Sequence, residues 1–147
     1  MIAVNELRIG NFLLENPKLK NPNITLPSVV IVVSEILHNR ISYNFPNLEH
    51  RVEAFEDDRL QTEPHYKNVN EVEPIPLTTE ILETCGFDKS HDTGIVIWKM
   101  KDFLITQQAD KNNYWIIICD KRVSVKYLHE LQNVYFYCER EELNVQL

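Results

Sequence analysis

The order of apolar and polar residues predicts a strand-rich first half. Residues 7–15 form the first predicted strand, and Gly10 inside it permits a bend or a bulge because glycine has no Cβ. Residues 16–27 follow with three prolines and three asparagines, and proline cannot donate to a strand ladder. This segment is therefore predicted to be a loop.

A second strand is predicted at residues 28–37, where a β-branched run makes the strongest strand pattern in the chain. His38 and Asn39 then turn the chain into residues 40–45, since asparagine tolerates a positive φ. The expected product is a small antiparallel sheet, and the bend at Gly10 would permit it to curl into a small barrel.

The middle of the chain carries weaker patterns. Leu48, Val52 and Phe55 stand at helical spacing, whereas residues 65–72 look extended. A structureless segment as long as residues 46–73 is unusual in a compact domain, so some helix or strand is expected there.

A short helix is predicted after an extended proline segment. Residues 73–76, Glu-Pro-Ile-Pro, must be extended because each proline pushes the preceding residue out of the helical region. Thr78 or Thr79 can then cap the helix by accepting a backbone N–H. Gly86 fits the left-handed position just after the helix, with Phe87 placed to fold back on Leu82 in a Schellman-type ending.

Three strands of an antiparallel meander are predicted next, at residues 94–100, 102–107 and 113–119. The polar segment before them is expected to be a loop. Trp98 and Trp115 each share a strand face with apolar neighbours, as in a half-buried pleated sheet. We assign both tryptophans to the core rather than to a ligand platform.

A second, amphipathic helix is predicted at residues 126–138. Its apolar side chains fall within an arc of about 120°, wide enough to pack on a sheet. They are Tyr127, Leu128, Leu131, Val134, Tyr135 and Cys138. The other side carries His129, Gln132, Phe136 and Tyr137, which either lie under a second layer or form an interface. The tail, residues 139–147, is expected to add an edge strand.

Length and composition indicate a single α+β domain spanning residues 1–147. The chain is 44% hydrophobic and 25% charged, which suits one core with a solvated surface. Cys85, Cys119 and Cys138 are odd in number and far apart, so reduced thiols fit better than disulfides or a zinc site. The first residues lack a signal-peptide pattern, and no apolar stretch approaches the ~20 residues that span a bilayer. We therefore expect a cytoplasmic protein without a membrane partner.

Charge makes nucleic acid an improbable partner. The net charge is −7, and phosphate binding needs concentrated positive charge. Acidic residues gather between residues 49 and 73, and a small basic group follows at residues 121–126. Both are interpreted as solvated surface.

The sequence contains no motif that indicates a catalytic, cofactor or metal site. His129-Glu130 begins like a zinc-protease motif, but Asn133 stands where the second histidine is needed. Cys85 and Cys138 are both expected on apolar faces, where cysteine behaves as a small hydrophobe rather than a nucleophile. The acidic residues lack the spacing of a calcium loop. With three glycines in the whole chain, the glycine-rich phosphate-binding motifs are also absent.

Three phrases of the sequence are distinctive. They are LRIGNF at residues 7–12, EPIPLT at 73–78 leading into ILETCGF at 81–87, and YLHELQNVYF at 127–136. Together they resemble an uncharacterised family of small proteins from gut-dwelling bacteria and their phages or prophages. The resemblance does not cover residues 16–27 or 46–70. It implies a mobile-element setting, and it implies no activity, cofactor or site residue.

The sequence favours a non-enzymatic, phage- or prophage-type accessory protein that recognises another protein or associates with itself. The candidate contact surface consists of His129, Gln132, Phe136 and Tyr137. The alternative is a small-ligand or nucleic-acid binding module built on the N-terminal strands, and an enzyme with a nonstandard site is a third hypothesis.

Overall fold

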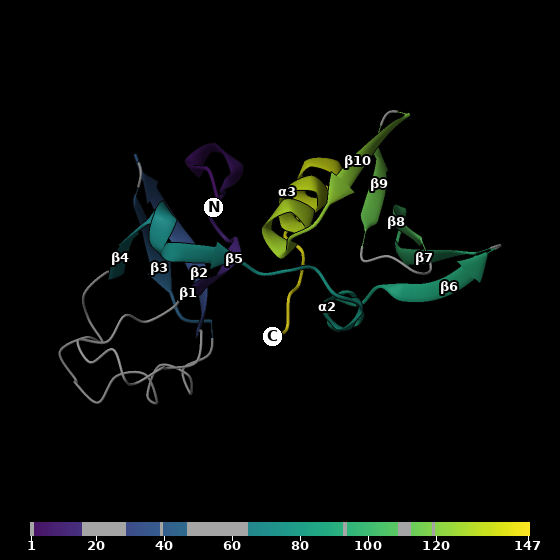
Figure 1. Cartoon of the computed structure of the whole chain (residues 1–147), viewed down its shortest axis with the longest axis horizontal. Helices are drawn as coiled ribbons and strands as arrows, with labels where there is room; N and C mark the ends of the chain where they lie inside the picture. Colours follow the sequence, from purple (N-terminus) through teal and green to yellow (C-terminus); the bar gives the residue numbers. More distant parts are fainter. Residues whose placement is uncertain are drawn as a thin grey trace. The chain divides into compact units, whose positions relative to one another are not determined.

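A computed structural model of the chain describes residues 2–15, 29–38, 40–46, 65–92, 94–108, 113–118 and 120–147. The chain divides into two compact units, Met1–Ile75 and Pro76–Leu147. Each unit has its own five-stranded antiparallel sheet and its own hydrophobic core (Figure 1). The fold class is α+β, as predicted. No helix among the described residues is long and apolar enough to cross a membrane.

In its described residues, the N-terminal unit consists of an antiparallel sheet and two short 3-10 turns. The sheet order is β4-β3-β2-β1-β5. The elements are η1 (Val4–Glu6), β1 (Phe12–Glu15), β2 (Val29–Leu37), β3 (Arg40–Asn44), β4 (His65–Asn68), η3 (Val69–Glu71) and β5 (Val72–Pro74). The predicted hairpin is confirmed, because Leu37 pairs with Arg40 and His38 takes the turn at a φ of 53°.

Two expectations for this unit need correction. The first strand begins at Phe12 rather than at residue 7, because Gly10 at a φ of 90° turns the chain just before it. Asn11 supports the turn by accepting the backbone N–H of Arg8 on its Oδ1 at 2.7 Å. Among the described strands, β4 and β5 end the sheet without pairing to each other, so no closed barrel is present there. The loop expected at residues 16–27 and the helical spacing around Val52 lie outside the described residues.

The C-terminal unit packs two helices on one face of its sheet, whose order is β10-β9-β8-β7-β6. The elements are α2 (Thr79–Thr84), β6 (Asp88–Asp92), β7 (Ile95–Met100), β8 (Phe103–Gln108), β9 (Tyr114–Ile118), β10 (Lys121–Val125) and α3 (Leu128–Glu139). The three predicted meander strands are confirmed as β7, β8 and β9. Leu82 from α2 and Leu131 from α3 share one core with Trp98 of the sheet.

Strands β6 and β10 were missed because their side chains are mostly polar. All five positions of β6 are exposed, and β6 pairs with β7 only. An edge strand needs a single hydrogen-bonded neighbour, and charged side chains on it discourage pairing with other chains. The polar segment expected to be a loop is therefore an edge strand.

Both ends of α2 agree closely with the prediction. Thr78 caps the helix by accepting the backbone N–H of Ile81 at 3.3 Å. After the helix, Gly86 adopts a φ of 90° and the N–H of Phe87 donates to the carbonyl of Leu82 at 3.0 Å. These contacts satisfy backbone groups that a helix end leaves open, as a Schellman ending does.

The end of α3 differs from prediction in two ways. Cys138 is exposed rather than part of the apolar side. The helix ends at Arg140 in the left-handed region, with a φ of 61°, and the expected edge strand in the tail does not form. Leu143 is instead buried in the core of the C-terminal unit without strand pairing.

Candidate functional site

Histidine, cysteine and carboxylate side chains are scattered over the described part of the chain. No cluster of three or more His, Cys, Asp or Glu side chains that could hold a metal occurs among the described residues. The centre of the acidic segment, residues 49–63, lies outside them. His38 and His91 are exposed in a turn and on an edge strand, respectively.

The two described cysteines occupy opposite environments. Cys85 is buried in the core, and this burial raises the pKa of its thiol to about 11. A thiol is nucleophilic mainly as the thiolate, so Cys85 is nearly inert at neutral pH. Cys138 is exposed on α3. It lies nine positions after His129 on the same helix, more than two turns away, so these two side chains cannot form a nucleophile–base pair.

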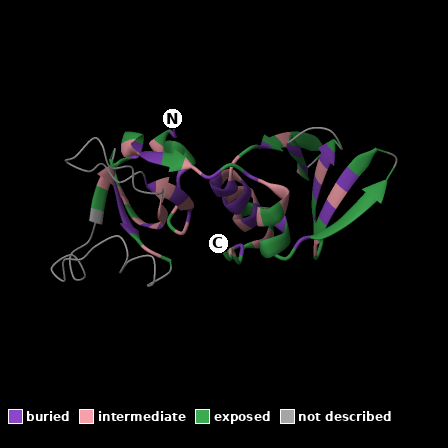
Figure 2. Cartoon of the chain, turned by 60° about the horizontal axis from the view of Figure 1, so that its bottom comes forward, coloured by how far each residue is buried: buried purple, intermediate pink, exposed green. Residues whose placement is uncertain are grey.

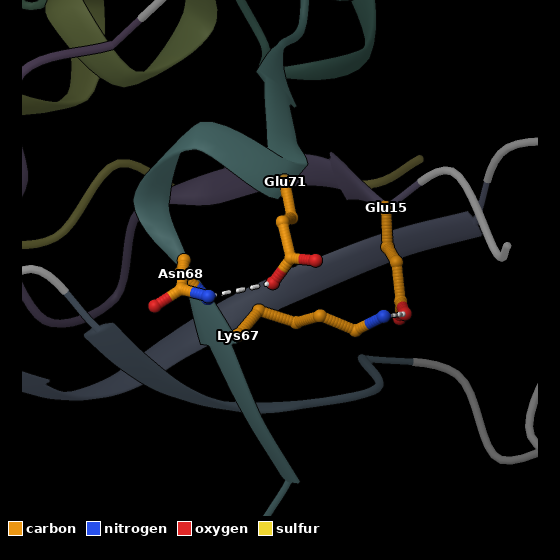
Figure 3. Close-up of polar contacts among 4 residues, drawn as sticks. All are labelled: Glu15, Lys67, Asn68 and Glu71. Atoms are coloured by element: carbon orange, nitrogen blue, oxygen red, sulfur yellow. Dashed lines mark hydrogen bonds and ion pairs between the residues drawn. The ribbon is translucent and has the colours of Figure 1, made fainter.

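A buried carboxylate in the N-terminal unit is held by a lysine. Glu15 on β1 lies 2.8 Å from the Nζ atom of Lys67 on β4, with 6% of the Glu15 side chain exposed (Figure 3). Beside this pair, the Nδ2 atom of Asn68 donates to Glu71 Oε2 at 3.1 Å. Strands β1 and β4 are separated in the sheet by β2 and β3, so the ion pair spans about three strand spacings and requires a strongly curved sheet.

The same carboxylate lies close to Tyr43. Burial raises the pKa of the Tyr43 hydroxyl far above its usual value, and the charge and hydrogen bonding of Glu15 raise it further. Tyr43 therefore stays protonated. The arrangement is a satisfied buried ion pair that braces the sheet, which we interpret as structural.

The contact surface predicted on α3 is divided by burial. His129 and Gln132 are each 1% exposed, Phe136 is partly buried, and Tyr137 is 64% exposed. The His129 ring stacks on Tyr127 at 5.9 Å between centroids, and Arg140 lies over the Tyr137 ring. Tyr137 is thus the most accessible of the four predicted residues.

A more extensive apolar surface lies on the C-terminal sheet, on the side opposite the helices. Exposed and buried positions alternate along β8 and β9, as Figure 2 shows. The outward positions of β7, β8 and β9 are mostly apolar. We call the apolar ones the outward patch, which consists of Ile95, Ile97, Leu104, Trp115 and Ile117.

Strand pairing brings the outward patch together. Thr106 on β8 stands between Ile97 on β7 and Trp115 on β9. The same register, continued by one residue, places Leu104 beside Ile117. Trp115 is 36% exposed and Ile117 is 59% exposed. The patch therefore crosses the three central strands of the sheet.

The rim of the outward patch carries opposite charges on opposite sides. Asp88 and Asp92 lie on β6, directly across from Lys99 and Ile95 of β7. Arg122 lies on β10, across from Ile117. An acidic edge and a basic edge thus face each other across the apolar centre of one surface.

Trp115 is where the sequence interpretation was wrong. Trp98 is fully buried and donates from Nε1 to Gln107 Oε1 at 3.1 Å, whereas Trp115 faces solvent. Strand β9 reads YWIII, so both of its faces are apolar and alternation alone cannot tell which side is the core. Only the pairing of β9 between β8 and β10, with helices on one side, identifies the exposed face.

Comparison with protein-family models, curated proteins and solved structures finds no match to this chain.

Proposed function

We propose that this protein is a non-enzymatic accessory protein that recognises another protein through the outward patch of its C-terminal sheet. The observation that carries the proposal is the exposure of Trp115 and Ile117 within a continuous apolar surface. Antiparallel sheets with one solvated face ordinarily carry polar residues there. Contiguous exposed apolar surface marks interaction sites, and tryptophan is among the residues that dominate binding energy at interfaces.

Charge at the rim narrows the kind of partner. A matching surface is apolar at its centre, with a basic group opposite Asp88 and an acidic group opposite Arg122. Such complementary charges favour one partner and one orientation over others. Tyr137 of α3, the exposed member of the surface predicted from the sequence, remains a second candidate contact.

A photo-crosslinking amino acid at Leu104 tests the proposal directly. The modified chain is expressed in its native host and irradiated, and the adducts are identified by mass spectrometry. We expect a protein adduct whose yield falls when Trp115→Ala is added, because loss of a central tryptophan costs about 2 kcal/mol, or roughly thirty-fold in affinity.

Two controls make this result specific. A probe at Tyr66, an exposed aromatic residue of the other unit, should not form the same adduct. Tyr137→Ala reports whether α3 contributes.

If the Leu104 probe gives no protein adduct, or one that Trp115→Ala leaves unchanged, the outward patch is not the recognition surface. A nucleic-acid adduct that is lost with added salt would favour the alternative of a nucleic-acid binding module.

A further inference from the structure

We propose that the surface covering the outward patch is the outward patch of a second copy of this chain. The inference rests on the proposed function, because it names the partner of the same surface. It follows from the order of side chains across the sheet, which makes the surface complementary to itself.

One row of outward side chains shows this complementarity. From edge to edge, the strands contribute Asp88, Lys99, Leu104, Ile117 and Arg122. Two copies stacked face to face can be related by a twofold axis that runs parallel to the strands and through β8. This operation reverses the row, so Asp88 of one copy lies over Arg122 of the second.

The same operation matches the neighbouring row. Ile97 lies over Trp115 of the second copy, and Thr106, on the axis, lies over its own counterpart. Stacked sheets pack with their strands within about 30° of each other, which preserves these pairings approximately. Each copy offers the same residues to the other, as an isologous dimer requires.

Charge selects this axis over the other possible one. A twofold axis lying in the sheet plane but perpendicular to the strands would place β6 over β6. With the axis at Ser90, Asp88 of one copy would then lie over Asp92 of the second, and like charges across an interface cost free energy. The axis parallel to the strands brings each acidic edge to a basic edge instead.

The expected association is moderate in strength. Five strands about 4.8 Å apart, with five or six residues each at about 3.3 Å, give a face of roughly 430 Å² per copy. A total of roughly 860 Å² is in the size range of weak, transient interfaces. We therefore expect a dissociation constant on the order of micromolar.

Sedimentation velocity on the full chain, over concentrations from about 1 to 100 µM, tests the inference across that range. The mass should rise from 17.4 kDa toward twice that value with concentration. Trp115→Ala should remain monomeric. Leu104→Lys, which puts a charge on the twofold axis, provides a second disruptive variant that does not alter the tryptophan.

Charge reversal tests the orientation of the axis. Asp88→Arg and Arg122→Asp should each weaken the dimer about fivefold to tenfold, because every dimer loses two rim pairs. The double variant restores both pairs with their signs exchanged and keeps the original net charge. It should therefore dimerise nearly as well as the original chain.

Three results would overturn this inference: a monomer at every concentration, a dimer indifferent to Trp115→Ala, or a double variant no better than the single ones. If the chain is monomeric while the Leu104 probe captures a different protein, the second copy is wrong and the proposed function stands. If neither association nor a protein adduct is seen, both fail.

Discussion

At the scale of single residues, the ion pair between Glu15 and Lys67 removes a carboxylate of the N-terminal unit from water. The Glu15 side chain is 6% exposed and the Lys67 side chain is 26% exposed. Removing a carboxylate from water is unfavourable unless a positive charge and hydrogen bonds replace the lost hydration. The two partners are therefore unequal, because the lysine retains more access to water than the carboxylate does.

This asymmetry predicts the order of two substitutions. Lys67→Met strands the Glu15 carboxylate and should lower the free energy of unfolding by about 1–3 kcal/mol. Glu15→Gln removes the buried charge itself, and Lys67 can turn toward solvent, so the loss should be smaller. Urea denaturation of both variants and of the double variant measures the difference.

The double variant should be no less stable than Lys67→Met alone, because it no longer contains a stranded charge. Equal losses for the two single variants would contradict the view that Glu15 is the more dependent partner.

The burial of one tryptophan could be predicted from the sequence, whereas that of the other could not. Trp98 was correctly assigned to the core, where it packs in the core that includes Leu82 and hydrogen bonds to Gln107. Trp115 was not, since its strand is apolar on both faces. A residue on such a strand is placed by its neighbours in the sheet, and those are set by pairing between segments distant in sequence.

At the scale of elements, α2 forms where local chemistry leaves little alternative. The proline segment before it is extended, Thr78 caps its first turn, and Gly86 ends it at a positive φ. Each of these features depends on residues within a few positions of one another. That is why the helix was predicted from sequence with nearly correct limits.

Thr78→Ala should therefore destabilise the C-terminal unit by about 1 kcal/mol, the usual cost of losing a side-chain cap. Thr79→Ala is the matched control, because Thr79 lies inside α2 and alanine has the higher helix propensity. Thermal unfolding followed by circular dichroism compares the two variants. A Thr79→Ala variant that loses as much stability as Thr78→Ala would show that the cap is not the source.

Elements that depend on distant partners were predicted less well. Strand β6 has no apolar residue and β10 has only Val123 and Val125, so both strands depend on the unpaired backbone groups that β7 and β9 offer. The tail shows the opposite error. Leu143 and Val145 alternate as in a strand, but they pack against the core without joining the sheet.

At the scale of the whole molecule, the α+β class followed from the sequence, whereas the division at Ile75 and Pro76 did not. A length of 147 residues is ordinary for one domain, and nothing in the composition changes abruptly at that point. The interaction surface predicted from the sequence also differs from the one that the folded sheet presents. The helical spacing of α3 suggested His129 and Phe136, but the larger accessible apolar surface is assembled from three strands and appears only in the folded sheet.

The central claim is that Trp115 and its neighbours are covered by another protein surface when the chain performs its function. Fluorine NMR of the chain labelled with 5-fluorotryptophan tests it most directly, because the sequence contains two tryptophans and Trp115→Phe assigns their resonances. We predict that the Trp115 resonance shifts or broadens as the chain is concentrated or placed in lysate of its native host, while the buried Trp98 resonance stays unchanged. A Trp115 resonance that keeps the position and solvent-isotope shift of an exposed ring under all of these conditions would contradict the account.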